Sequence, residues 1–302
     1  MKDQKQFSIR MAQSLAEVPA AAWDACAGGV DACIGEAIAS AAKVKHEDSE
    51  DKSFAQLSTR GQVGNPFVSH DFLSSLEVSF SVGPRTGWLP RHLLLEDAGG
   101  ALVGAAPCYV KTHSRGEYVF DHGWADAFER AGGAYYPKLQ GAVPFTPVTG
   151  PRLLVCSGPH REAVRGALAD ALGEITTDND LSSAHVTFLT EPEWRLLGER
   201  GFLQRTDQQF HWENAGYASF EDFLRRLSSR RRKTIRRERK EALTPGIEVC
   251  WLTGSDLTEA VWDAFFAFYM ETGSRKWGRP YLTRRFFSML GERMPGRASA
   301  CR

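Results

Sequence analysis

The chain has 302 residues, which is enough for two domains that each bury a core. Its apolar content of 42% and charged content of 25% are ordinary for a globular protein, and the absence of any run of about 18 apolar residues excludes a membrane-spanning helix. Lysine plus arginine equals aspartate plus glutamate, at 37 each, so the net charge by itself indicates no class of partner.

Cysteine usage argues against a structural zinc site. No CxxC pair occurs and no histidine lies at ligand spacing, so we expect no metal site and a reducing compartment. The polar start, MKDQKQFSIR, leads into no apolar segment, so we expect a cytoplasmic protein. The six cysteines are Cys26, Cys33, Cys108, Cys156, Cys250 and Cys301.

The first elements are a strand, a helix and a polar connection. Phe7–Arg10 predicts a strand, and Ala16–Ala27 carries helix formers around Trp23. Residues 28–63 are rich in alanine, glycine and charge, which favours a solvated connection. A new unit begins near Asn65, with Ser69 as the expected N-cap of a helix.

A β-hairpin follows. Residues 88–97 predict one strand, Gly99-Gly100 its turn, and residues 102–111 the returning strand. Tyr118-Val119-Phe120 combines aromatic and β-branched residues, which predicts a strand end just before Asp121.

The remainder of the first domain alternates helices and strands, which predicts an α/β domain on a mixed sheet with a boundary near residues 214–216. An amphipathic helix opens after Gly158-Pro159-His160. The other predicted elements are a helix over 125–140, a strand over 152–155, a strand over 184–190, a helix from Glu191 and a strand over 203–212.

A second unit opens with Ser219 as the cap of a helix over 220–243, which would be about 36 Å long at 1.5 Å per residue. A strand over 247–252 and helices over 258–271 and 283–293 follow. Strands should then cover the phenylalanine-rich faces, but only a polar tail remains, so we expect a truncated or frame-shifted end. That leaves Phe265, Phe266, Phe286 and Phe287 short of partners.

The expected division is therefore into three parts. Residues 1–64 form a strand, a helix and a polar connection that belong to the first domain. Residues 65–215 form the core of that domain. Residues 216–302 form an incomplete second domain that opens with a basic helix.

The stretch from 116 to 155 gathers the residues suited to chemistry. Asp121-His122 follows the predicted strand end and could act as a general base or orient an attacking amine, or form only a structural pair. Residues 143–151 hold three prolines, which cannot lie in a central strand. They favour an edge strand beside a pocket, or a stiff turn without function.

Common phosphate and hydrolase motifs are absent from the sequence. There is no G-x-S-x-G, P-loop or Rossmann fingerprint, which removes the commonest hydrolases, phosphate-loop enzymes and dehydrogenases. Gly158, His160 and Arg161 at a helix start could hold a phosphate, or mark a plain helix entry.

The helix after residue 228 is crowded with positive charge. Like charges four residues apart oppose helix formation by a few tenths of a kcal/mol each, so the run requires an explanation. A polyanion such as RNA or a phosphate-bearing substrate would supply one. A solvated face is the main alternative, and a membrane-surface role is a weaker one. The run holds no interleaved aromatic residues, which argues against sequence-specific contacts with bases. The proposed polyanion contacts are Arg230, Arg231, Arg232, Lys233, Arg236, Arg237 and Lys240.

Four segments resemble the FemAB-like proteins of the GNAT superfamily, often described as peptidoglycan biosynthesis or recognition proteins. They are EYVFDHGWADA, YYPKLQ, VPFTPVTGPRLL and SSRRRKTIRRERKEAL, and the likeness runs from about Asn65 to about Arg293. The superfamily's loop for the CoA pyrophosphate is matched only by CSGPHRE.

The resemblance implies tandem GNAT-like (acyl-CoA N-acyltransferase) domains, the second incomplete, and attack by an amine on an activated acyl carbonyl. The donor would be aminoacyl-tRNA or acetyl-CoA, with no tightly bound cofactor, and the acceptor a small molecule or a peptidoglycan precursor. Asp121 and His122 would handle the proton. The expected substrate-binding residues are Tyr118, Trp124, Tyr136, Lys138, Phe145, Thr146, Thr149 and Arg152.

Two rival functions stay open. One is an acetyl-CoA-dependent N-acetyltransferase, and the other is a non-catalytic module that binds RNA or a cell-wall precursor. The sequence leaves the oligomeric state open as well.

Overall fold

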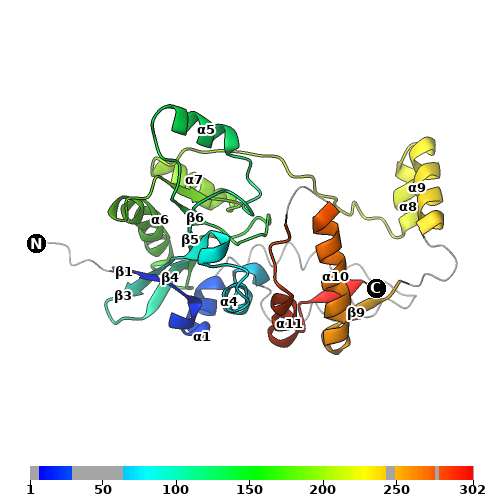
Figure 1. Cartoon of the computed structure of the whole chain (residues 1–302), viewed down its shortest axis with the longest axis horizontal. Coiled ribbons are helices and arrows are strands. Elements are labelled where there is room, and N and C mark those ends of the chain that lie inside the picture. The colour runs from blue at the N-terminus through cyan, green and yellow to red at the C-terminus, as the bar shows by residue number, and fades with distance from the viewer. Residues whose placement is uncertain (1–6, 29–63, 243–248, 276–278, 302) are drawn as a thin grey trace, which may run out of the picture.

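The computed structural model describes residues 7–28, 64–242, 249–275 and 279–301 (Figure 1). Most of the predicted polar connection over residues 28–63 therefore lies outside the described residues. Within the described ranges, the strands form two four-stranded sheets and one two-stranded sheet. This mixed α/β architecture confirms the expected fold class, whereas the tandem GNAT arrangement stays an expectation.

The first sheet confirms the predicted N-terminal strand and hairpin. Its order is β1-β3-β4-β7 and every neighbouring pair is antiparallel. The strands are β1 (Phe7–Ala12), β3 (His92–Asp97), β4 (Leu102–Ala106) and β7 (Leu154–Val155).

Helices cover both faces of this sheet. On β3, Leu94 packs with the helices α1 (Ala20–Ala27) and α4 (His70–Val78), while Leu93 and Leu95 pack against α6 (Arg161–Asp178). A strand buried on both faces reads as a continuous apolar run, which is what Leu93-Leu94-Leu95 shows. The predicted N-cap of α4 is confirmed, because Ser69 Oγ accepts a hydrogen bond from Phe72 N at 3.3 Å.

The second sheet corrects the prediction of two long hairpin strands. Each of those strands is divided between the two sheets, at Arg91 and at Pro107, and Pro107 has no N–H to donate to a sheet ladder. The order is β2-β5-β6-β8, with β6 and β8 parallel. The strands are β2 (Trp88–Pro90), β5 (Cys108–Lys111), β6 (Lys138–Gly141) and β8 (Ala184–Val186).

The region between β5 and β6 differs from its prediction. Tyr118-Val119-Phe120 is a loop and not a strand end, and Tyr118 takes a positive φ of 56°. The helix expected over 125–140 is the shorter α5 (His122–Arg130). It ends before Gly132, whose φ of 87° is a conformation that favours glycine, and the chain then enters β6.

Of the two alternatives for residues 143–151 the structure shows the turn and not the edge strand, and the strand predicted over 203–212 is wrong. The proline-rich run at 143–151 leaves β6 as turns and irregular chain, since its three prolines cannot donate to a ladder. Residues 203–212, after α7 (Glu191–Glu199), run without regular structure toward the second unit (Figure 1).

The single long helix predicted over 220–243 is also wrong. Leu227 is extended, with a ψ of 156°, and separates α8 (Phe220–Arg226) from α9 (Ser229–Ala242). The second helix folds back onto the first: Arg236 pairs with Glu221, and the Arg239 guanidinium lies 4.3 Å from the centroid of the Phe220 ring. Figure 1 shows this helical hairpin standing apart from the sheets.

The last elements of the chain include a helix that packs against α4. They are β9 (Trp251–Thr253), α10 (Glu259–Arg275), α11 (Arg284–Arg293) and β10 (Ser299–Cys301). Phe286 and Phe287 of α11 are buried, and the Phe286 ring centroid lies 5.7 Å from that of Phe72 on α4.

The expectation that these phenylalanines lack partners is therefore wrong. Phe286 packs on α4, whereas the Phe287 ring contacts α10, with its centroid 5.2 Å from that of Phe265 and 6.0 Å from that of Phe266. Phe266 is partly buried, and Phe265 remains 39% exposed. The tail expected to be without strands also differs, because β10 pairs antiparallel with β9.

Candidate functional site

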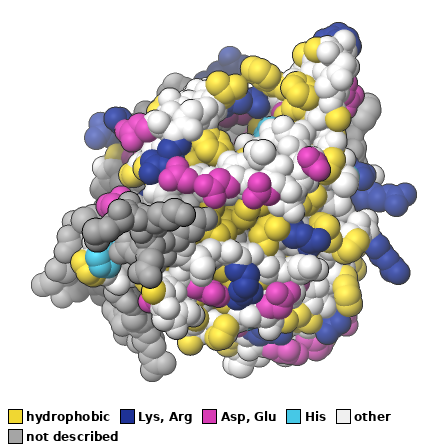
Figure 2. Space-filling model, turned by 90° about the vertical axis from the view of Figure 1, so that its left-hand side faces the viewer, with side chains coloured by type: hydrophobic (Ala, Val, Ile, Leu, Met, Phe, Trp, Pro, Cys, Tyr) yellow, Lys and Arg dark blue, Asp and Glu magenta, His cyan; other side chains and the backbone are white. Residues whose placement is uncertain are grey.

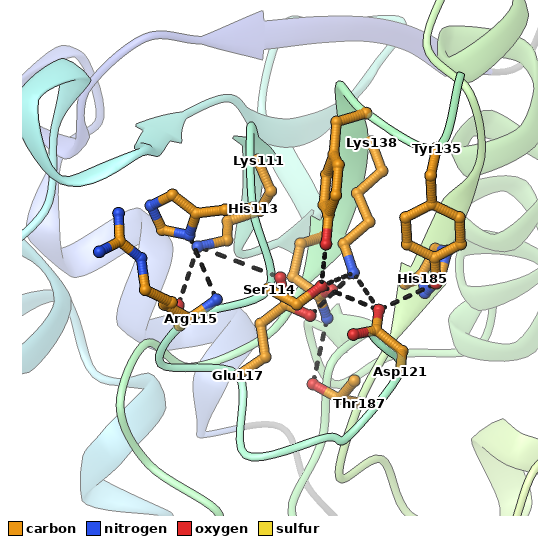
Figure 3. A network of polar contacts seen from close by, with 12 residues as sticks. Lys111, His113, Ser114, Arg115, Glu117, Asp121, Tyr135, Lys138, His185 and Thr187 are labelled. Carbon is orange, nitrogen blue, oxygen red and sulfur yellow. Dashed lines mark hydrogen bonds and ion pairs between the residues drawn. The ribbon is translucent and has the colours of Figure 1, made fainter. Parts of the chain in front are cut away.

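A network of buried charges lies where β5 ends and the antiparallel β6 begins. The Lys138 Nζ donates to Glu117 Oε2 and Asp121 Oδ2, both at 2.8 Å, and to Ser114 Oγ at 2.9 Å (Figure 3). Lys138 is 0% exposed, Asp121 1% and Glu117 4%. We call Lys111, Ser114, Glu117, Asp121, Tyr135 and Lys138 the Lys138 cluster.

Strand register and one glycine build this cluster. Lys138 on β6 pairs with Lys111 on β5, so two lysines meet at the same end of the sheet. The loop over 112–121 then returns across them. Gly116 in this loop has a φ of 81°, and a Cβ there would lie 2.7 Å from the Phe145 ring, so glycine is required. Backbone and packing thus bring the loop carboxylates to the lysines.

Asp121 and His122, predicted to act together, diverge. The helix α5 begins at His122, so the His122 side chain is exposed while Asp121 turns inward. Asp121 Oδ2 accepts hydrogen bonds from Ser114, Tyr135 and Lys138. Burial acts to raise the pKa of Asp121, but the hydrogen bond and charge of Lys138 outweigh it and place that pKa below its usual value. Asp121 is therefore ionised at neutral pH.

The pKa of Glu117 is shifted in the opposite direction, above its usual value. Its Oε2 is held by Lys138, but its Oε1 has no hydrogen-bond partner among the described residues and lies 4.0 Å from Lys111 Nζ. Burial raises the pKa of Glu117, and Lys138 and Lys111 only partly oppose this. A carboxylate with a raised pKa and an open oxygen is suited to accept a proton.

Lys111 is the second unusual group. Its Nζ donates to the Arg115 carbonyl at 3.1 Å and lies 3.7 Å from the centroid of the Trp88 ring. Burial lowers the pKa of Lys111 to about 7. This amine therefore exchanges its proton near neutral pH, next to Glu117.

The predicted substrate-binding residues are only partly brought together. The Tyr136 hydroxyl lies 2.8 Å from Ser114 Oγ, so Tyr136 and Lys138 meet at the cluster, and the Phe145 ring packs on Trp88 beside it. Tyr118, Trp124 and Thr149 are exposed.

Thr146 and Arg152 make local contacts instead. The Thr146 hydroxyl donates to the Pro144 carbonyl. The buried Arg152 guanidinium donates to the carbonyls of Val148, Pro151 and Thr187, so it holds the backbone.

Sequence reasoning missed four members of the cluster. Lys111, Ser114 and Glu117 stand in the polar run KTHSRGE between the hairpin and Asp121, and Tyr135 precedes the predicted Tyr136. The sequence feature that could have revealed them is a polar run directly after a buried strand. Nothing in such a run distinguishes a charge that becomes buried from one that stays in solvent.

Gly158, His160 and Arg161 lie elsewhere, at the start of α6. They line a cavity of ≈ 420 Å³ together with Phe7, Asp97 and Cys156, and no residue of the Lys138 cluster lines it. The helix start confirms the local prediction, while phosphate binding there stays a prediction.

The basic residues of α9 are mostly exposed. Arg230, Arg231, Lys233 and Lys240 face solvent, whereas Arg236 pairs with Glu221. On the opposite end of the molecule, acidic and basic side chains are interspersed (Figure 2). The positive charge is thus concentrated on one helical hairpin of a chain with balanced charge.

Two features are absent from the described residues. No group of three His, Cys, Asp or Glu side chains is placed there to hold a metal ion. Nor does any helix in those ranges have the length and apolarity needed to cross a membrane.

Comparison with known protein families gives a match over nearly the whole chain. A family model named FemAB-like, with the description peptidoglycan biosynthesis/recognition, matches residues 14–300. No curated protein and no solved structure matches the chain.

Proposed function

The chain belongs to the FemAB-like family of peptidoglycan biosynthesis and recognition proteins, and on that premise we propose that it transfers an activated acyl or aminoacyl group to an amine of a cell-wall precursor. Such a transfer joins the amine nitrogen to the acyl carbon and releases the donor's leaving group. The donor is aminoacyl-tRNA or acetyl-CoA.

The Lys138 cluster carries this proposal. An ammonium group cannot attack a carbonyl until it loses a proton, so the reaction needs a proton acceptor beside the amine. Glu117 offers one in its Oε1, which has no hydrogen-bond partner in the described part of the chain. Lys111, with its pKa lowered by burial to about 7, lies 4.0 Å away and takes the proton onward.

Asp121 and Lys138 have a positioning role in this scheme. Asp121 stays ionised, because Lys138 holds its pKa below the usual value, and so it is a weak proton acceptor. Its three hydrogen bonds, from Ser114, Tyr135 and Lys138, instead fix the Lys138 ammonium against Glu117 Oε2. The proton-handling role expected of the Asp121-His122 pair passes in this proposal to Glu117 and Lys111.

Substrate access requires the loop over 112–121 to move, because Glu117 is 4% exposed. The loop includes Tyr118, whose φ of 56° is a sparsely populated conformation for a residue other than glycine. Loops that close over a site and exclude water are common where acyl intermediates must be protected from hydrolysis.

Replacing Glu117 with glutamine tests the proposal. Transfer should fall by about 10²- to 10⁴-fold while the fold is kept, since the amide cannot accept the proton. The assay supplies labelled aminoacyl-tRNA and acetyl-CoA in parallel, with a peptidoglycan-precursor amine as acceptor, so the consumed donor identifies the reaction. His122→Gln is the matched control and should retain activity, because His122 is exposed. Full activity in a folded Glu117→Gln protein would remove Glu117 from the reaction.

A second candidate function rests on α9, whose exposed charges fit a module that binds RNA without catalysis. If single-stranded RNA binds there, the affinity should fall with salt with a log–log slope of about −0.7 per phosphate contacted. Changing Arg230, Arg231 and Lys233 to glutamine should then make that slope shallower by about 2. Arg195→Gln, an exposed arginine on α7, should leave it unchanged. Equal slopes in both variants would exclude α9 as the contact.

A further inference from the structure

Two cysteines far apart in the sequence meet in the core of the first unit. Cys26 lies on α1 and Cys156 directly after β7, and their Sγ atoms are 2.9 Å apart. Cys26 is fully buried, whereas Cys156 is half-buried and lines the cavity at the start of α6 with Ser157 and Gly158. One thiol is therefore beside a solvent-accessible space and the other is behind it.

We propose that Cys156 is a modification site that reacts with hydroperoxides, and that Cys26 is its resolving partner, so that the pair closes a reversible disulfide. The proposal is independent of the acyl transfer proposed above, and it concerns a different part of the molecule from the Lys138 cluster. It rests on the position of the two sulfurs and on the cavity that reaches one of them.

The two thiols have unequal chemistry. The hydrogen bond from Cys26 favours the thiolate of Cys156 and lowers the pKa of Cys156 to about 7, against the opposing effect of burial. The same contact, together with burial, raises the pKa of Cys26. Because the thiolate is the reacting species, Cys156 attacks first. Low pKa, solvent access and a neighbouring thiol are the features that mark peroxide-sensing cysteines.

The chemistry takes two balanced steps. The Cys156 thiolate attacks one peroxide oxygen, the O–O bond breaks, and the leaving oxygen takes up a proton, which gives a sulfenic acid and water or an alcohol. The Cys26 sulfur then attacks the sulfenic sulfur, the S–O bond breaks, and the hydroxide leaves as water with the Cys26 proton. The two thiols together lose two electrons and the peroxide gains them.

Little movement is needed for the second step. A disulfide has an S–S distance of about 2.05 Å, so the sulfurs must approach by about 1 Å from their separation of 2.9 Å. The bond would join α1 to the end of β7 across 130 positions of the sequence. Closing so long a loop restricts the unfolded chain, and the folded protein should become more stable.

Cys108 provides an internal control. It is fully buried on β5, and burial raises its pKa to about 12. It should therefore react far more slowly than Cys156 under the same conditions, although both belong to the same folded chain.

The experiment treats the reduced full chain with equimolar hydrogen peroxide and maps the products by mass spectrometry. We expect a disulfide-linked peptide pair that contains Cys26 and Cys156 and is two hydrogens lighter than the reduced pair, with Cys108 unmodified. The Tm should rise by about 5 °C or more and return on reduction with dithiothreitol. In Cys26→Ser, oxidation should stop at a sulfenic acid on Cys156, trapped by a dione probe.

The mapping on the natural sequence needs no variant, so the proposal stays testable even if Cys26→Ser fails to fold. Oxidation of Cys156 no faster than that of Cys108 would overturn it. So would a disulfide that joins Cys156 to another cysteine.

Discussion

Replacing Lys138 with methionine is expected to lower the free energy of unfolding by about 3–5 kcal/mol at pH 7. The substitution keeps most of the side-chain volume but removes the only charge within 3 Å of the carboxylates of Glu117 and Asp121 in the described structure. Both carboxylates would remain buried, and an uncompensated buried charge is costly. Urea denaturation of both proteins measures the difference.

A matched control distinguishes the loss of the buried Lys138 charge from the loss of an exposed positive charge. Arg195→Met removes the partner of Glu191 in an exposed ion pair on α7 and should cost less than about 1 kcal/mol. If Lys138→Met were no more destabilising than Arg195→Met, the Lys138 cluster would not be the closed, buried network described above.

Replacing Lys111 with methionine is expected to change how stability depends on pH. In the folded chain burial lowers the pKa of Lys111 from 10.5 to about 7. Between these values the unfolded chain holds a proton that the folded chain lacks, so the free energy of unfolding rises with pH, by up to about 1.4 kcal/mol per unit. Below the folded pKa both states are protonated and this dependence ends.

The methionine variant should lack that slope between pH 7 and pH 10. The measurement is urea denaturation of both proteins across this range, compared as a difference so that other titrating groups cancel. Lys233→Met, which removes an exposed lysine from α9, should keep the slope of the natural chain. Parallel stability curves for the natural chain and Lys111→Met would show that Lys111 carries its usual charge.

The pKa directions also define a pH window for the proposed reaction. The pKa of Glu117 is raised, so its proton-accepting form is lost on acidification earlier than that of an ordinary glutamate. Lys111 becomes protonated below pH of about 7 and can then accept no proton. Both effects act in the same direction and place the activity on the neutral to alkaline side.

Local patterns determined a good part of the fold. The Gly99-Gly100 turn between apolar strands predicted the β3–β4 hairpin, and the amphipathic spacing after His160 predicted α6. Ser69 before an apolar run predicted the cap of α4. These features depend on neighbours within a few residues, so a single sequence contains them. The short motifs likewise indicated the family that matches residues 14–300.

The predictions of strands, helices and packing that were wrong share one kind of cause. The hairpin strands divide at Arg91 and Pro107 because their two halves pair with strands of different sheets. The helix expected over 220–243 breaks at Leu227, and α9 packs on α8. Phe286 on α11 packs against Phe72 on α4, more than 200 positions earlier in the sequence. Each outcome depends on packing against a distant segment, which local propensity does not encode.

The sequence by itself determined that a lysine, a tyrosine pair and an aspartate stand in one region between 116 and 155, and that an α/β chain surrounds them. Only the tertiary structure decided that Lys111 joins Lys138 through strand register, that Asp121 turns inward while His122 faces solvent, and that Cys26 meets Cys156. The physical reason is that proton affinity follows burial and charged neighbours, and both are set by contacts between residues far apart along the chain.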